Sequence, residues 1–145
     1  MSTIMRKVNV LSRSEGVYRT DKLGIPELKN CHHSYVFAIC NNPGLSQDDL
    51  AKHISVNKSN VARTLLYLEE KGYITRKSGE KDRRINGVFP TAKMLSVYPK
   101  IKEITMEWNR FLAEDLTKEE FEQFQSILER LTKKAAVYME GREEK

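Results

Sequence analysis

A run of small polar and basic side chains follows Asn57 and has the composition of a surface that contacts nucleic acid. Val61, Leu65 and Leu68 recur at helical spacing, so the polar residues between them are expected on the opposite surface. A helix fits the major groove of B-DNA, where asparagine can pair with adenine and arginine with guanine. An ordinary solvated helix face is the alternative. The candidate contact residues are Lys58, Ser59, Asn60, Arg63 and Thr64, with Tyr67 on the same surface.

A second basic cluster lies in residues 71–84, which contain six lysines and arginines and two acidic residues. The whole chain has 25 lysines and arginines against 20 aspartates and glutamates, a net charge of +5. Most of this positive excess therefore lies in residues 71–84. Lys81, Arg83 and Arg84 fall on a predicted turn between two strands, from which arginines can enter a narrow, electronegative minor groove. We interpret Asp82 as the partner of a neighbouring arginine. A charged hairpin tip without a specific role is the alternative.

Cys31, His32, His33 and Cys40 are residue types that bind metals or sense oxidants, but their spacing argues against both. The cysteines lie nine positions apart on one predicted helix, about 13 Å along its axis, which is too far for a disulfide. Adjacent histidines point to different sides of a helix, unlike the i, i+4 pair that holds a metal. Structural roles are therefore favoured, and no cofactor is expected. The chain contains no nucleophile elbow, phosphate loop or HExxH motif, which argues against an enzyme.

The polar helix is predicted to be the second of two helices joined by a short turn. Ser46 is a favoured cap for the first helix, and Ser46 and Gln47 at its start are candidates to hold phosphates. Asn57 is a favoured cap for the second helix, which is expected to end near residue 70. Strands are predicted at residues 73–77 and 84–89, joined as a hairpin. This order of elements predicts a helix-turn-helix followed by a wing.

Further helices are predicted before this unit. The first covers about residues 3–20 and is broken at Gly24, which permits a left-handed helix end. Proline is common at the first position of a helix, so Pro26 is expected to begin the next one, which runs to about Cys40.

Two long helices are predicted after the hairpin. One begins at Thr91 and contains Pro99, which is expected to kink it because proline lacks an N–H and crowds the preceding turn. The other begins at a capping box formed by Thr117 and Glu120. Its apolar residues recur at spacings of three and four, which favours a seam between subunits; packing within one subunit is the alternative. The seam residues are Phe121, Phe124, Leu128, Leu131, Ala135 and Tyr138.

Several segments resemble the MarR family of winged-helix transcription regulators. They are residues 44–51, 57–65 and 68–74. The tetrad Lys81-Asp82-Arg83-Arg84 is similar to that family's wing signature, in which Asp-Arg-Arg precedes a strand and a Thr-led helix, here at Thr91. The resemblance covers about residues 26–138. The chain differs in lacking the glycine often found shortly after that threonine.

The resemblance implies a mainly α fold of the α+β class, a winged helix-turn-helix with long terminal dimerisation helices. It implies a homodimer that binds double-stranded DNA at a pseudo-palindromic operator and represses transcription. In many members a small aromatic effector, or thiol oxidation, releases the DNA. The corresponding regions are an N-terminal dimerisation helix in residues 1–25, a DNA-binding domain in residues 26–90, and linking and dimerisation helices in residues 91–145.

Composition also bears on location and on rival functions. The longest apolar run, residues 35–40, is far shorter than a bilayer span, and the charged residues among the first 16 are unlike a signal peptide. With only two cysteines, a soluble protein of the reducing cytoplasm with no membrane partner is expected. One rival function is a winged helix that binds protein instead of DNA, because fold does not fix function. The other is a thiol- or metal-sensing regulator of the same fold.

Overall fold

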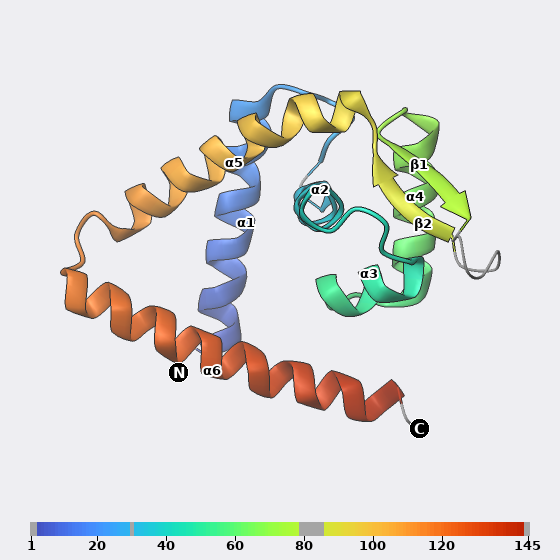
Figure 1. Cartoon of the computed structure of the whole chain (residues 1–145). Coiled ribbons are helices and arrows are strands. Elements are labelled where there is room, and N and C mark those ends of the chain that lie inside the picture. Colours follow the sequence, from blue (N-terminus) through green and yellow to red (C-terminus); the bar gives the residue numbers. More distant parts are fainter. Residues whose placement is uncertain (1–2, 30, 79–85, 144–145) are drawn as a thin grey trace. The chain divides into compact units, whose positions relative to one another are not determined.

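The computed structural model describes residues 3–29, 31–78 and 86–143. The chain divides into two compact units, residues 1–108 and 109–145. Figure 1 shows the elements in chain order, beginning with α1 at the blue end of the sequence. They are α1 (Ile4–Leu23), α2 (His32–Asn41), α3 (Gln47–Ile54), α4 (Lys58–Glu70), β1 (Ile74–Ser78), β2 (Asn86–Pro90), α5 (Ala92–Ala113) and α6 (Lys118–Glu143).

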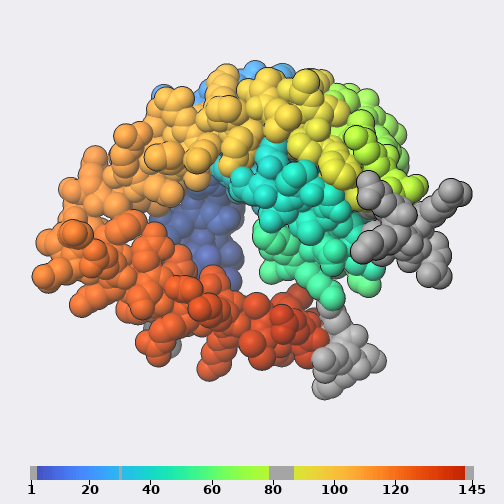
Figure 2. Space-filling view, in the orientation of Figure 1, coloured from blue at the N-terminus to red at the C-terminus, as the bar shows by residue number. Residues whose placement is uncertain are grey.

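The core of the first unit is built from α2, α3, α4, the strands and the start of α5. Val61, Leu65 and Leu68 are fully buried, which confirms the apolar face expected for α4. Figure 2 shows the segments from α2 to the start of α5, coloured cyan to yellow, as one closely packed body. Burial of these side chains supplies the main favourable term for folding. Other core residues of this unit include Tyr35, Val36, Ile39, Leu50, Tyr73, Ile74, Val88, Met94 and Ile101.

The two strands form an antiparallel hairpin that is also joined to the turn before α3. Arg76 of β1 lies opposite Val88 of β2. On the other side of β2, the Gly44 N–H donates to the Val88 carbonyl at 2.8 Å, and the Val88 N–H donates to the Leu45 carbonyl at 2.9 Å. A Cβ at Gly87 would lie 2.9 Å from the Gly44 carbonyl oxygen, so this close approach requires glycine. The base of the wing is therefore fixed to the helix-turn-helix.

Helix starts agree with the caps expected from the sequence. The Ser46 Oγ accepts a hydrogen bond from the Asp49 N–H at 3.1 Å, and the Asn57 Oδ1 accepts one from the Asn60 N–H at 2.7 Å. Thr117 and Glu120 form the predicted capping box, with reciprocal bonds of 3.1 and 3.3 Å. Each bond satisfies an N–H that the first turn of a helix leaves without an intrahelical partner.

The predicted start of α2 is wrong by six residues. Gly24 ends α1 with φ +64°, as expected, but the chain then forms turns through Pro26 instead of a helix, and α2 begins at His32. The reason is tertiary. Leu28 is buried in the core, and the His32 Nδ1 accepts a hydrogen bond from the Lys29 N–H at 2.9 Å. These contacts hold residues 25–29 in turns and override the preference of proline for a helix start.

The terminal helices carry large apolar side chains on their surfaces. In the second unit, α6 exposes Phe124, Ile127 and Leu131. In the first unit, α1 exposes Val8 and Leu11. Within the described residues, no helix has both the length and the apolar character needed to cross a membrane.

Candidate nucleic-acid interface

The N-terminal half of α4 presents a basic, exposed face. Lys58, Ser59 and Arg63 are exposed. The Ser59 hydroxyl donates to the Asn57 cap at 2.9 Å, and the Lys58 ammonium lies 3.8 Å from the Asp48 carboxylate. Both members of that ion pair are exposed, so it contributes little stability and leaves Lys58 free to exchange partners. In the part of the chain that the structure describes, the Arg63 guanidinium has no partner.

The flank of α4 beside this face packs against α2 and the turn before it. The Tyr35 hydroxyl donates to the Asn60 Oδ1 at 2.7 Å, and Thr64 is half-buried. The Tyr67 hydroxyl donates to the Glu27 carbonyl at 2.7 Å, and its ring stacks on His32 with centroids 5.0 Å apart. Asn60 and Tyr67 lie three and four positions from Arg63, on the same side of the helix, and Thr64 lies four positions after Asn60. All three are half-buried, whereas Ser59 and Arg63 are exposed, so the three form the inner edge of the exposed face.

The N-terminus of α3 holds the two candidate phosphate-contacting residues. The Ser46 hydroxyl oxygen is occupied by capping, but its O–H is still available to donate. The Gln47 Oε1 accepts from the Arg76 guanidinium at 3.2 Å, which leaves the Gln47 amide to donate outward. Helix N-termini favour anions, so both side chains are placed to donate to phosphate oxygens.

Arg76 on β1 has a structural role that the sequence does not predict. The sequence places it only in the basic cluster, yet its guanidinium lies 3.7 Å from the Glu69 carboxylate as well as contacting Gln47. Arg76 thus links the wing to α3 and α4. The Glu69 carboxylate partly offsets the charge of Arg76, although among the described residues the buried Nε has no hydrogen-bond partner. No local sequence signal marks this role, because the partners lie 7 and 29 positions away.

The predicted wing contacts Lys81, Arg83 and Arg84 lie outside the described residues. The strands on either side, β1 and β2, are described. On β1, the Lys77 ammonium lies 5.1 Å from the centroid of the Phe89 ring, a cation–π contact at the base of the wing.

Known proteins share this arrangement. A family model described as MarR family matches residues 23–85. The HTH-type transcriptional regulator BilQ of Clostridium symbiosum is 31% identical over 99 residues, which covers 68% of this chain and 69% of that protein. A crystal structure of MarR is 30% identical, covers 97% of this chain and 95% of that one, and superposes with a TM-score of 0.81. The chain belongs to the MarR family.

The similarity to known transcriptional regulators extends over most of the chain. An uncharacterized HTH-type transcriptional regulator of Bacillus subtilis, YybA, is 28% identical over 133 residues, which covers 92% of this chain and 89% of that protein. The protein is therefore a DNA-binding transcriptional regulator with the winged-helix fold expected from the sequence, and its family is one of regulators rather than enzymes.

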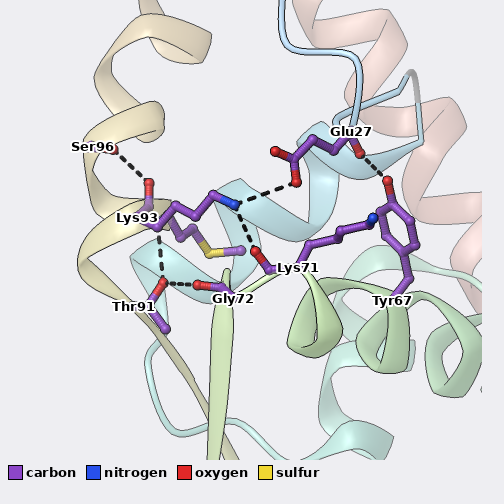
Figure 3. Close-up of polar contacts among 8 residues, drawn as sticks. Glu27, Tyr67, Lys71, Gly72, Thr91, Lys93 and Ser96 are labelled. Atoms are coloured by element: carbon purple, nitrogen blue, oxygen red, sulfur yellow. Dashed lines mark hydrogen bonds and ion pairs between the residues drawn. The ribbon is translucent and has the colours of Figure 1, made fainter.

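A polar network ties the C-terminal end of α4 to neighbouring segments of this regulator. Figure 3 shows the Lys93 ammonium between the Lys71 carbonyl, at 2.7 Å, and the Glu27 carboxylate, at 3.5 Å. The same ammonium lies 4.4 Å from the centroid of the Tyr73 ring. The Thr91 hydroxyl donates to the Gly72 carbonyl at 2.6 Å. The carbonyls at the end of α4 are thus satisfied by the start of α5.

His32 is a buried titratable residue on this flank of α4. Its side chain is 8% exposed, and burial lowers the pKa of the imidazole, with the charge of Lys29 lowering it further. The neutral form is also the one that accepts the hydrogen bond from the Lys29 N–H. His32 is therefore neutral in the folded protein under conditions in which a free histidine is partly charged.

We expect the folded state to lose stability as the pH falls below about 6.5, the ordinary pKa of histidine. Because the unfolded chain takes up the proton at a higher pH than folded His32 does, stability rises with pH between the folded and unfolded pKa values. Thermal melting from pH 8 to pH 5 measures this. His32→Gln is expected to flatten the dependence, whereas His53→Gln, at an exposed histidine of α3, is expected to retain it. Equal flattening by both variants would contradict the assignment.

The cysteines and remaining histidines form no cluster suited to a metal in the described part of the chain. Both cysteines are free, Cys31 exposed and Cys40 half-buried. Burial raises the pKa of the Cys40 thiol, which disfavours the reactive thiolate.

An open groove of about 400 Å³ lies among α2, α3 and α5. Its walls combine apolar Phe37 and Ile54 with the polar side chains of His33, Asn41 and Thr105. Phe37 packs edge-on against Tyr98, with centroids 5.7 Å apart, so the aromatic wall is supported from behind. The volume lies within the range typical of small-molecule sites.

Proposed function

We propose that this MarR-family regulator is a cytoplasmic homodimeric repressor that binds a pseudo-palindromic operator and is released by a small aromatic effector. The observation that carries the proposal is the exposed face of α4, where Lys58, Ser59 and Arg63 project from the first two turns of the helix. The N-terminal residues of a recognition helix are the ones that reach base edges in the major groove.

The contacts divide into base-reading and positioning groups. The residues proposed to read bases in the major groove are Ser59, Asn60, Arg63 and Thr64. Lys58 is proposed to contact the DNA backbone beside them. Ser46 and Gln47 at the start of α3 are proposed to hold phosphates, which orient the protein without reading sequence. Lys81, Arg83 and Arg84 of the wing are proposed to contact the minor groove and its backbone.

Dimerisation is supported by the apolar surfaces of the terminal helices. Phe124 of α6 is 48% exposed and Leu131 is 46% exposed, which is costly unless another surface covers them. A two-fold axis would place two recognition helices ~34 Å apart, which is one turn of duplex. The regions proposed for dimerisation are residues 1–25 and 91–145, and the region proposed for DNA binding is residues 26–90.

The groove among α2, α3 and α5 supports the effector proposal. Phe37 and Ile54 offer an apolar surface for a ring, and the His33 imidazole, the Asn41 amide and the Thr105 hydroxyl offer polar partners. Because α3 forms one wall, a ligand there would act on the helix that is proposed to hold phosphates. Thiol or metal sensing has no comparable support from the described residues.

Selection of fragments from genomic DNA with the purified protein tests the function. We expect a site with two half-sites about one helical turn apart, bound at least about 10³-fold more tightly than random duplex. Benzoate and hydroxybenzoate, as small aromatic probes, are expected to weaken that binding. Failure to bind any duplex at low salt would contradict the proposal and favour the rival function, a protein-binding winged helix.

The wing is expected to contribute phosphate contacts that salt weakens. Replacing Arg83 or Arg84 by alanine is expected to lower affinity and to reduce the slope of log K against log salt concentration by ~0.9 for each phosphate that the variant no longer neutralises. Binding titrations at several salt concentrations measure the slope. The control is Lys102→Ala, at an exposed lysine of α5, which is expected to leave the slope unchanged. An unchanged slope in the wing variants would argue against phosphate binding by these arginines.

A further inference from the structure

A buried tyrosine touches the recognition helix at one of its proposed base-reading residues. The Tyr35 side chain is 2% exposed, and its hydroxyl donates to the Asn60 Oδ1 at 2.7 Å. In the described part of the chain, the Nδ2 of Asn60 has no partner. The carboxamide of Asn60 thus has its acceptor held from inside the protein and its two donor hydrogens available.

The chemistry of the two groups fixes the direction of this hydrogen bond. An amide oxygen can only accept, so the Tyr35 hydroxyl is the donor and the Asn60 Oδ1 the acceptor. Because the tyrosine is buried, this bond holds the Asn60 amide with its Oδ1 toward the protein.

We propose that Tyr35 is a positioning residue that makes Asn60 a hydrogen-bond donor toward DNA and thereby sets base preference at one operator position. The inference rests on the proposed function, in which α4 enters the major groove. A donor amide is suited to the acceptors of guanine (N7 and O6), thymine (O4) and adenine (N7), but cytosine offers only its N4 donor there. The bidentate pairing with adenine expected from the sequence requires the Oδ1 that Tyr35 occupies.

Removing the Tyr35 hydroxyl is expected to let the Asn60 side-chain amide rotate by 180°, which exchanges its oxygen and nitrogen. In Tyr35→Phe, the Asn60 Oδ1 can face the groove and accept from the amino group of cytosine or adenine. The variant is therefore expected to change which bases are tolerated, while non-specific binding, which depends on phosphate contacts, stays the same.

The experiment measures the dissociation constant for the selected operator and for every single-base variant of one half-site. Asn60→Ala identifies the position that Asn60 reads, as the one where preference flattens. At that position the wild-type protein is expected to disfavour cytosine by roughly tenfold or more, in the range of a single side chain–base contact. Tyr35→Phe is expected to lose most of this discrimination and to gain affinity for sites with cytosine or adenine there.

A matched control variant and a double-mutant cycle distinguish positioning of Asn60 from a general loss of stability. The Tyr98 hydroxyl donates to the Asn41 Oδ1, also at 2.7 Å, between α5 and the end of α2, so Tyr98→Phe removes the same type of bond away from α4. Tyr98→Phe is expected to leave base preference unchanged. In the Asn60→Ala background, Tyr35→Phe is expected to change base preference no further.

Each outcome decides the inference. It is overturned if Tyr35→Phe keeps the wild-type base preference where Asn60→Ala flattens it, or if its effect persists in the Asn60→Ala background. It is also overturned if Asn60→Ala changes no position while the operator is still bound, a result that leaves the proposed function intact. Absence of any selective duplex binding overturns both. If Tyr35→Phe fails to fold, the wild-type protein decides, because a preference for cytosine at the position that Asn60→Ala identifies requires an outward-facing Oδ1 and contradicts the inference.

Discussion

Replacing Phe124 and Leu131 together by lysine is expected to give a monomer that binds the operator about 10²–10⁴-fold more weakly than the wild-type protein. Both residues are roughly half exposed on one stripe of α6, and a lysine ammonium cannot be buried there without a partner. Two recognition helices held in one dimer bind two half-sites as a single ligand, and a monomer loses that advantage. Analytical ultracentrifugation and operator titration measure the two effects on the same sample.

The control carries the same two added charges on the polar side of the same helix. Gln123→Lys with Ser126→Lys, at exposed positions of α6, is expected to remain a dimer and to bind the operator at least as tightly as the wild-type protein. A Phe124/Leu131 variant that is monomeric yet keeps full operator affinity would refute the link between dimerisation and DNA binding. A variant that stays dimeric would place the subunit interface elsewhere.

Features set by local chemistry could be predicted from the sequence. The caps at Ser46, Asn57 and Thr117 depend on residues three positions away, so the sequence contains all the necessary information. The same holds for Gly24, whose left-handed conformation ends α1. The buried face of α4 follows from the spacing of its aliphatic residues, and all three predicted core residues of that face are buried.

Features set by contacts between distant segments could not be predicted. Pro26 looks like a helix start, but burial of Leu28 and the His32 imidazole keep the chain in turns. The sequence predicts that the Asn60 amide is free to read a base. Its partner Tyr35 lies 25 positions earlier and becomes a neighbour only when α2 packs against α4, so this hydrogen bond could not be predicted. Sequence periodicity separates the core of a helix from its surface, but it does not tell a solvent face from an edge that a second helix covers.

Arg63 is exposed on α4, as the sequence predicts, and it is proposed to read a base in the major groove. It is exposed on the second turn of α4, on the same face as Ser59. Its side chain presents a planar fork of donors that matches the O6 and N7 acceptors of guanine, a pairing worth about 1–3 kcal/mol against the wrong base. Arg63→Ala is therefore expected to weaken operator binding by roughly 10- to 100-fold and to relax the preference at one base pair.

Arg63→Lys distinguishes a base contact from a phosphate contact. Lysine keeps the positive charge but not the fork, so a guanine-reading Arg63 predicts loss of base preference with the salt dependence of binding unchanged. A phosphate-binding Arg63 predicts the reverse pattern, with base preference retained in Arg63→Lys and a shallower salt slope in Arg63→Ala. Titrations of both variants against the operator and its single-base variants separate the two cases. Guanine reading is favoured because the hydrogen bonds at Tyr35 and Tyr67 fix the position of α4, and with it the point from which Arg63 projects.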